Sequence, residues 1–301
     1  MSKFIKHIFY KQRAAFMADL PQREQRFSLP KDVIEEKNIA YSTDGASAHH
    51  LDVYHPSSQK DSSLPVILNI HGGGLILGCK EFNRYFCAQL CKLGYLVFNL
   101  EYRLVPDCLF YDQCNDIFLA MEYIRQHLSS FHGTSDQIYA VGDSGGACLL
   151  TYCCAMQNCD AISRAAGVQP SSLKLKGLGL ISGMFYTNKL DSIGLFLPKY
   201  LYGTSYKKGP FAPYVNPEHP ALVKALLPCI LITSHKDSLR NYTLQFEKAL
   251  TKYQVPHTLL DFPAKKELTH AFSVFEPFLP ESLEVQKAIS DFFCRIDFKR
   301  K

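Results

Sequence analysis

With 301 residues the chain is longer than a typical single domain, although α/β folds of this length are often one unit. Hydrophobic residues make up 47% of the chain and aromatic residues 13%, which allows a large core and excludes intrinsic disorder. The net charge of +5 is modest and the basic residues are scattered, so the sequence predicts no nucleic-acid-binding surface.

Eleven cysteines raise the question of disulfides. Their number is odd, no two are spaced as CxxC, and several lie in apolar runs that have helical periodicity. These are Cys87, Cys91, Cys148, Cys153 and Cys154. Free cysteine is among the most buried residue types, so we expect packed thiols rather than disulfides or metal ligands. Free thiols indicate a reducing compartment, and we expect a cytoplasmic protein.

The first residues of the chain mix apolar and basic side chains. The apolar residues at positions 4, 5, 8 and 9 are interrupted by Lys6 and His7, so they do not form the apolar core of a signal peptide. No run of about 18 apolar residues occurs anywhere, and we expect no membrane span. The spacing instead suits an amphipathic helix that lies on the protein's own surface.

Strand-like and helical patterns alternate along the rest of the chain. Eight strand-like segments lie at 34–41, 49–54, 65–70, 95–100, 137–141, 175–181, 229–233 and 257–262. Helical patterns follow at 117–128, 239–253 and 283–293. The run at 65–70 is continuously apolar, as expected for a strand that is buried on both faces. This alternation predicts one α/β domain with a largely parallel sheet flanked by helices.

One long segment, residues 185–220, interrupts the alternation. It is rich in Tyr, Phe, Leu, Pro and Gly and separates the strands predicted at 175–181 and 229–233. A long insertion of this kind in a compact domain is usually functional, and a lid over a site is one such function.

The pentapeptide GDSGG at 142–146 is the first chemical motif. A G-x-S-x-G pattern alone is weak, but here a strand is predicted at 137–141 and a helix at 147–157. This strand-turn-helix setting is the nucleophile elbow, in which glycines permit the crowded turn that exposes the serine hydroxyl. We therefore predict that Ser144 is a nucleophile.

The same pentapeptide also surrounds the nucleophile of chymotrypsin-like proteases. Those proteases are all-β and place the histidine and the aspartate before the serine. In this sequence a helical pattern follows Ser144, and no upstream histidine lies in an Ala-Ala-His-Cys setting. Both observations disfavour the chymotrypsin-like class.

A hydroxyl nucleophile needs an anion-binding loop, an acid and a base. HGGG at 71–74 follows a predicted buried strand, and its backbone N–H groups suit an oxyanion. Asp237 follows the strand at 229–233 and is the predicted acid, with Asp261 as its rival inside a strand. His270 follows the last strand and is the predicted base, with His235 and His257 as alternatives. The order serine, aspartate, histidine is the order of the α/β-hydrolases.

Five motifs in this order resemble the hormone-sensitive-lipase-like branch of the α/β-hydrolase esterases, over nearly the whole chain. They are HGGG at 71–74, YRLVP at 102–106, GDSGG at 142–146, DSLRN at 237–241 and HAF at 270–272. The resemblance implies that the N–H groups of Gly73, Gly74 and Gly145 are the oxyanion donors. The residues that support these motifs are His71, Gly72 and Asp143. The resemblance also implies a cap formed by residues 1–40 and 185–215, which closes an apolar pocket over the nucleophile.

Three residues of these motifs depart from the usual pattern of the branch. Ser238 and Asn241 stand where the branch usually has proline and an acid, which puts in doubt how Asp237 is held. Gly145 stands where alanine is commoner, but its role needs only a backbone N–H. Arg103 is predicted to be structural and to pair with a buried acid rather than with substrate.

Together these features predict a carboxylic ester hydrolase that works through an acyl-enzyme on a small-molecule ester, without a cofactor or a metal. The short, aromatic cap favours short acyl chains. Two alternatives stay open: an amidase or peptidase with the same triad, and a non-catalytic ligand-binding member of the fold, against which His270 argues. The sequence alone selects neither a physiological ester nor an oligomeric state.

Overall fold

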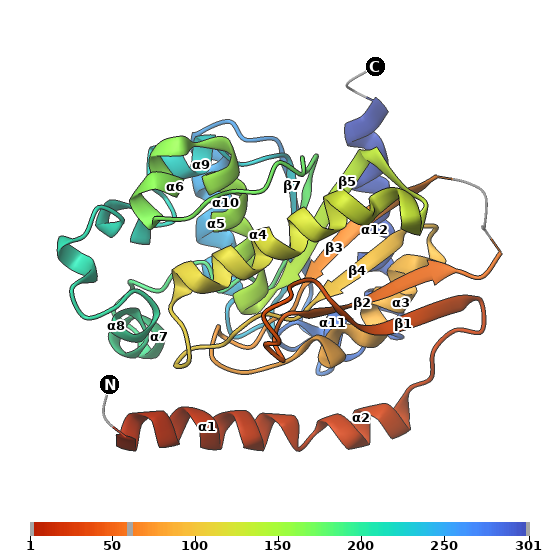
Figure 1. Ribbon diagram of the computed structural model, residues 1–301, viewed down its shortest axis with the longest axis horizontal. Helices are drawn as coiled ribbons and strands as arrows, with labels where there is room; N and C mark the ends of the chain where they lie inside the picture. Colours follow the sequence, from red (N-terminus) through yellow and green to blue (C-terminus); the bar gives the residue numbers. More distant parts are fainter. Residues whose placement is uncertain (1–2, 59–62, 299–301) are drawn as a thin grey trace.

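The computed structural model describes residues 3–58 and 63–298, built around an eight-stranded sheet with helices on both faces (Figure 1). The strands follow the order β1-β2-β4-β3-β5-β6-β7-β8 across the sheet. β2 is antiparallel to both of its neighbours, and all pairs from β4 to β8 are parallel. The predicted α/β fold with a mostly parallel eight-stranded sheet is confirmed.

The strands are β1 (Val33–Ala40), β2 (His50–Pro56), β3 (Leu64–Ile70), β4 (Leu96–Leu100), β5 (Gly133–Asp143), β6 (Leu178–Ile181), β7 (Cys229–Ser234) and β8 (His257–Phe262). The α-helices up to β6 are α1 (Lys3–Met17), α2 (Leu20–Arg26), α3 (Arg84–Lys92), α4 (Phe110–His127), α5 (Ser144–Asn158) and α6 (Asp160–Ala166). The later α-helices are α7 (Ser192–Phe196), α8 (Pro198–Leu201), α9 (Pro220–Lys224), α10 (Arg240–Lys252), α11 (Phe272–Phe275) and α12 (Pro280–Phe298). The 3₁₀ turns are η1 (Lys80–Asn83), η2 (Leu128–Phe131), η3 (Tyr206–Lys208) and η4 (Ala212–Val215).

Each predicted strand overlaps an observed one, and the largest differences concern β5 and β6. β5 begins at Gly133 rather than at 137, because Gly133 pairs with Leu64 at the start of β3. β6 begins at Leu178 rather than at 175. These differences leave the carboxyl ends of the strands, where the predicted site residues lie, almost unchanged.

The two faces of the sheet are covered by two separate hydrophobic clusters. Along β3, Val66 and Leu68 belong to one cluster and Ile67 belongs to the other, since side chains alternate along a strand. Helices α4, α5 and α10 supply the first cluster, and α3, α11 and α12 supply the second. Burial on both faces explains the continuous apolar runs in the sequence.

All eleven cysteines are free thiols, as the sequence predicts. Nine are buried, Cys159 is half-buried and Cys294 is exposed. Burial raises the pKa of the Cys148 thiol to about 12 and that of the Cys91 thiol to about 12, so both stay protonated and inert.

Helices α1 and α2 lie outside the two layers that cover the sheet, along one side of the molecule (Figure 1). Phe9 of α1 packs on the cap segment, with ring centroids 5.7 Å from Phe196 and 5.4 Å from Tyr200. The two predicted cap segments are therefore in contact, while their closing over the nucleophile stays a prediction. Within the described ranges, no helix is long and apolar enough to cross a membrane.

Candidate active site

The turn between β5 and α5 has the geometry of a nucleophile elbow. Ser144 is the first residue of α5 and has a φ of 48°, in the left-handed region that non-glycine residues rarely adopt. The turn is so tight that a Cβ on Gly146 would lie 2.0 Å from the carbonyl oxygen of Ile70. Only glycine fits there, and this close contact locks the start of α5 against the end of β3.

The structure brings Ser144, His270 and Asp237 together from three loops at the carboxyl ends of β5, β8 and β7. His270 Nε2 lies 2.9 Å from Ser144 Oγ, and His270 Nδ1 lies 2.7 Å from Asp237 Oδ1. The Asp237 side chain is fully buried, whereas 29% of the His270 side chain is exposed. Residues far apart in the chain thus form one continuous hydrogen-bonded row.

Asp237 is held by groups outside the two motif positions that depart from the resemblance. The Thr233 hydroxyl donates to Oδ2 at 2.8 Å, and the Leu239 N–H donates to Oδ1 at 2.9 Å. Burial alone would raise the pKa of Asp237, but the hydrogen bonds from His270 and from the Leu239 N–H outweigh it and lower the pKa. The carboxylate is therefore ionised and fixed without help from Ser238 or Asn241.

The rival acid and bases have other partners. Asp261 forms an ion pair with Arg240, at 2.5 Å between Nη2 and Oδ2. His235 Nε2 lies 3.2 Å from Arg240 Nη2, and His257 Nδ1 lies 2.8 Å from the carbonyl oxygen of Val255. Neither histidine has a hydrogen bond to Ser144, which leaves His270 as the candidate base.

The glycine loop after β3 lies directly against Gly145. A Cβ on Gly145 would be 2.9 Å from the Leu75 nitrogen and 3.0 Å from the Gly74 nitrogen. The N–H groups of Gly73 and Gly74 donate no hydrogen bond within the described part of the chain. The Gly145 N–H is in the first turn of α5, where a helix has no internal acceptor. Gly74 and Gly145 thus lie against each other, and Gly73 precedes them in the same loop; that the three N–H groups bind an oxyanion stays a prediction.

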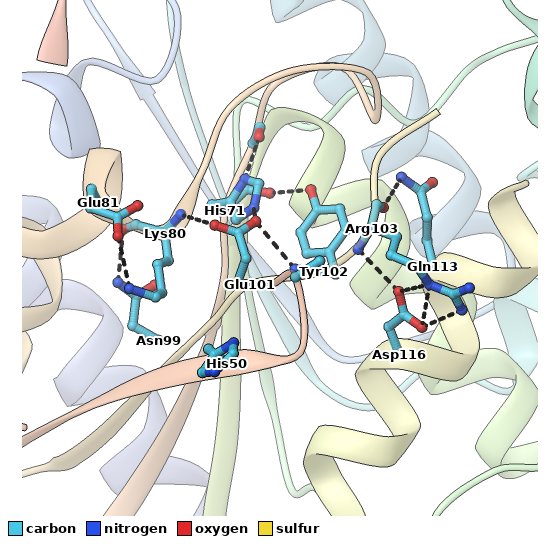
Figure 2. Close-up of polar contacts among 12 residues, drawn as sticks. His50, His71, Lys80, Glu81, Asn99, Glu101, Tyr102, Arg103, Gln113 and Asp116 are labelled. Atoms are coloured by element: carbon cyan, nitrogen blue, oxygen red, sulfur yellow. Dashed lines mark hydrogen bonds and ion pairs between the residues drawn. The ribbon is translucent and has the colours of Figure 1, made fainter. Parts of the chain in front are cut away.

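The His71 side chain connects this loop to Glu101 and Tyr102, and Figure 2 shows the three residues. Its Nε2 lies 2.9 Å from Glu101 Oε1 and its Nδ1 lies 2.7 Å from the Gly72 carbonyl oxygen. Its ring stacks on Tyr102 at 4.3 Å, and the Tyr102 hydroxyl donates to the His71 carbonyl oxygen at 2.7 Å. Burial alone would lower the pKa of His71, but the Glu101 carboxylate outweighs it and raises the pKa. Both ring nitrogens face oxygens, which is the arrangement of an imidazolium.

Asp143 joins the elbow to the same loop. Its Oδ1 accepts hydrogen bonds from the Gly72 N–H at 3.0 Å and from Asn83 Nδ2 at 2.8 Å. Burial raises the pKa of Asp143 against the opposing effects of Asn83 and His71. The residue before the nucleophile therefore acts on the glycine loop and does not reach the row of Ser144, His270 and Asp237.

The predicted pairing of Arg103 with a buried acid is confirmed. Arg103 Nη2 lies 2.6 Å from Oδ1 of Asp116, which is fully buried (Figure 2). Gln113 Nε2 donates to the carbonyl oxygens of Leu75 and Arg103, at 2.9 Å each. These contacts hold the far end of the glycine loop.

Two arginines that the sequence did not single out contact the segments around the site. Arg13 of α1 donates to the carbonyl oxygens of Ile76 at 2.7 Å and Val105 at 2.6 Å. Arg23, on the next helix, donates to the carbonyl oxygens of Val274, at 2.6 Å, and Phe275, just after His270. The N-terminal helices thus hold both the glycine loop and the segment that carries the candidate base.

Among the residues that the structure describes, one cluster has the ligand atoms for a metal, namely Cys79, Glu81 and Glu101. Its two carboxylates already have cationic partners, since Lys80 Nζ lies 2.8 Å from Glu81 Oε1 and His71 pairs with Glu101. With its charge matched in this way, the cluster does not fit a divalent cation. That the chemistry needs no metal stays a prediction.

The chain is similar to several known esterases. The BD-FAE family matches residues 51–175. Carboxylesterase NlhH from Mycobacterium tuberculosis is 24% identical over 268 residues, 85% of this chain and 80% of that protein. A probable isoprenylcysteine alpha-carbonyl methylesterase from Oryza sativa is 27% identical over 212 residues, 67% of this chain and 50% of that protein. The chain spans half or less of the length of the methylesterases of this type that it matches.

A solved structure agrees over almost the whole chain. Esterase B from Lactobacillus rhamnosis has a TM-score of 0.90 at 24% identity, covering 99% of this chain and 96% of that chain. The chain has the α/β-hydrolase fold, which its sheet order and the turn at Ser144 define. Its resemblance to the hormone-sensitive-lipase-like carboxylesterases is confirmed.

Gly145→Ala tests how closely the glycine loop approaches the elbow. The added Cβ would press on the Gly74 and Leu75 nitrogens, so the loop must move. We expect the kcat for ester hydrolysis to fall, by at most the roughly 3 kcal/mol that losing one oxyanion donor costs. Gly209→Ala, where an added Cβ meets only an ordinary 3.7 Å contact, is the control. A kcat equal to wild type for Gly145→Ala would show that the loop tolerates the methyl group.

Arg13→Met tests whether α1 positions the glycine loop. The substitution keeps the aliphatic stem but removes hydrogen bonds to three carbonyl oxygens, at Ile76, Leu104 and Val105. Since hydrogen bonds to charged groups contribute about 1.5–3 kcal/mol each, we expect lower thermal stability and a lower kcat with a smaller change in KM. Lys11→Met on the exposed side of the same helix should leave kcat unchanged, and equal effects of the two variants would contradict the positioning role.

Glu101→Gln tests the His71 ion pair through its pH dependence. A histidine whose pKa is raised in the folded state adds stability that is complete below about pH 6.5, its unfolded value, and disappears as the pH rises through the folded pKa. The variant should therefore lose more free energy of unfolding at pH 6 than at pH 9, measured by urea denaturation. A loss that is the same at both pH values would indicate a neutral His71; Glu122→Gln, on an exposed ion pair, is the control.

Proposed function

We propose that the protein is a serine carboxylic ester hydrolase with Ser144, His270 and Asp237 as its catalytic triad. The observation that carries the proposal is the row of contacts from Ser144 Oγ to His270 Nε2, at 2.9 Å, and from His270 Nδ1 to Asp237 Oδ1, at 2.7 Å. A nucleophile, a base within hydrogen-bonding distance and an acid that orients the base are the parts that acyl transfer needs.

The proposed reaction has two halves. His270 Nε2 accepts the Ser144 proton while Oγ attacks the ester carbonyl carbon, and Asp237 stabilises the imidazolium. The N–H groups of Gly73, Gly74 and Gly145 donate to the oxyanion. His270 then protonates the leaving alcohol, and a water molecule, deprotonated by the same nitrogen, releases the acid from the acyl-enzyme. No cofactor takes part in either half.

For the substrate, we propose small esters with short acyl chains. The cap segment at 185–215 is short and aromatic, which suits a small pocket better than a long acyl channel. Esterase B of Lactobacillus rhamnosis, which has the same fold, has been solved after inhibition by a C4-C4 tributyrin phosphonate. For the cellular location, eleven free thiols favour a reducing compartment, and we propose the cytoplasm.

Ser144→Ala is the direct test. The variant should lose nearly all hydrolysis of p-nitrophenyl acetate and butyrate, because no other group replaces the nucleophile, and wild type should prefer these esters to the longer p-nitrophenyl esters. Removal of a triad serine typically costs about 10⁶ in kcat. Unchanged activity in Ser144→Ala would disprove the proposal, and Ser163→Ala, a buried serine on α6 whose hydroxyl donates to the Asp160 carbonyl oxygen, controls for general damage.

Matched ester and amide substrates separate this proposal from its alternatives. An esterase should cleave the ester much faster than the amide of the same acyl group, whereas equal rates would indicate an amidase or peptidase. A fluorophosphonate probe should label wild type and not Ser144→Ala. Failure to label wild type would instead indicate a ligand-binding protein.

A further inference from the structure

The most exposed apolar side chains gather in one region. Among large hydrophobic residues of the described chain, the three with the greatest exposure are Leu190 (93%), Phe4 (71%) and Leu195 (70%). Single exposed leucines are common on protein surfaces, but three of this degree on neighbouring segments are not. All three belong to α1 or to the segment 185–216.

These two segments form one continuous surface. The packing of the Phe9 ring against Phe196 and Tyr200 joins the first turns of α1 to α7 and α8, which are neighbours in Figure 1. Leu190 and Leu195 line an open groove of about 860 Å³. Its basic lining residues are Lys189, Lys199, Lys207 and Lys208. We call the surface formed by residues 3–11 and 189–208 the basic apolar face.

The charge of the molecule is concentrated in the same two segments. α1 has four basic residues and no acidic one, a net charge of +4. Residues 185–216 have four lysines and Asp191, a net charge of +3. Their total of +7 exceeds the +5 of the whole chain, so the remainder of the protein is slightly acidic. Basic residues of α1 and of residues 185–216, which are far apart in the sequence, thus lie on neighbouring segments of the folded protein.

The lysines of the basic apolar face are not neutralised by the protein. Lys3, Lys6, Lys11, Lys199, Lys207 and Lys208 are exposed, and among the described residues none of these forms an ion pair. Asp191, the acid of the segment, caps α7 through the Ile193 and Gly194 N–H groups and accepts from the Tyr242 hydroxyl. The Asp191 carboxylate is therefore occupied by these three groups of the protein.

We propose that the basic apolar face docks on the surface of an anionic phospholipid bilayer. Exposed leucine and phenylalanine beside lysine is the composition of elements that lie in the membrane interface, with apolar side chains below the headgroups and ammonium groups among the lipid phosphates. Each lysine near an anionic surface strengthens binding by about fivefold. A nucleic acid would match the lysines but leave the leucines in water. The proposal concerns binding alone and does not depend on the proposed esterase activity.

Docking would also orient the proposed active site. Arg13, two residues beyond the basic apolar face on α1, donates to the carbonyl oxygen of Ile76, just after the glycine loop. The same helix thus contacts both the bilayer and the loop beside Ser144, and the bound molecule presents that side to the lipid.

Co-sedimentation of the full chain with vesicles tests the proposal. We expect binding to vesicles of phosphatidylcholine with phosphatidylserine and little binding to phosphatidylcholine alone. Binding should weaken strongly in 1 M salt, where the screening length falls to about 3 Å. Equal binding to both vesicle types, or binding to neither, would overturn the proposal.

Variants locate the contact. Lys207→Gln with Lys208→Gln should weaken binding by about fivefold for each lysine, and Leu190→Ser with Leu195→Ser should weaken it further at high salt. Lys92→Gln with Leu93→Ser changes an exposed lysine and an exposed leucine at the C-terminal end of α3 and should bind like wild type. Equal losses in this control would place the contact elsewhere and refute the proposal.

Two controls exclude other causes. All variants should keep the wild-type melting temperature, and Ser144→Ala should bind vesicles like wild type, since docking needs no catalysis. Light scattering measures the oligomeric state without lipid. A dimer that dissociates in Leu190→Ser with Leu195→Ser would assign the face to a second copy of the chain and overturn the proposal.

Discussion

The close contact between the start of α5 and the end of β3 is the constraint on which the rest of the site depends. With no room for a Cβ between Gly146 and the Ile70 carbonyl oxygen, helix and strand approach at backbone distance. The turn between them can close only if Ser144 adopts a left-handed φ, which costs about 1–3 kcal/mol and must be supported by the surrounding structure. Nearly the whole of α5 is buried against the sheet, and this burial supplies that support.

The glycine loop that lies against the start of α5 also needs support from other parts of the protein. Three consecutive glycines have no side chains to anchor them and lose much conformational entropy when ordered. The loop is therefore ordered by groups of other elements. These groups are Asp143 of the elbow, Glu101 and Tyr102 just after β4, and Arg13 of α1. Three of these groups are ionisable: Asp143 is buried, and Arg13 and Glu101 are mostly buried. Buried charges are tolerated only when they are fully paired, so removing one partner should disturb the loop as a unit.

Much of the fold and site follows from the sequence because the underlying signals are local. Apolar runs predict the strands, and the order of motifs points to Ser144, Asp237 and His270 before any distance is known. How Asp237 is held was less predictable, because Thr233 lies in a strand and Leu239 acts through its backbone N–H. Neither leaves a pattern that a motif describes.

Arg13 and Arg23 show more clearly which contacts a sequence pattern does not predict. Their acceptors are backbone carbonyl oxygens 63 and 251 residues away, and a carbonyl oxygen has no sequence signature. The spacing of apolar residues therefore predicts that α1 is an amphipathic surface helix. It does not predict which segments of the protein this helix contacts.

The N-terminal helices also show why one segment serves both the site and the surface. An isolated 15-residue helix is only marginally stable in water, so α1 needs contacts with the rest of the protein to persist. Phe9 supplies these contacts on the cap, Phe16 supplies them on Phe82 and Phe275, and Arg13 supplies them on the glycine loop. Any ligand that binds the exposed side of α1 in its folded form stabilises all three sets of contacts together. A surface that orders α1 must for this reason also favour the ordered glycine loop beside Ser144.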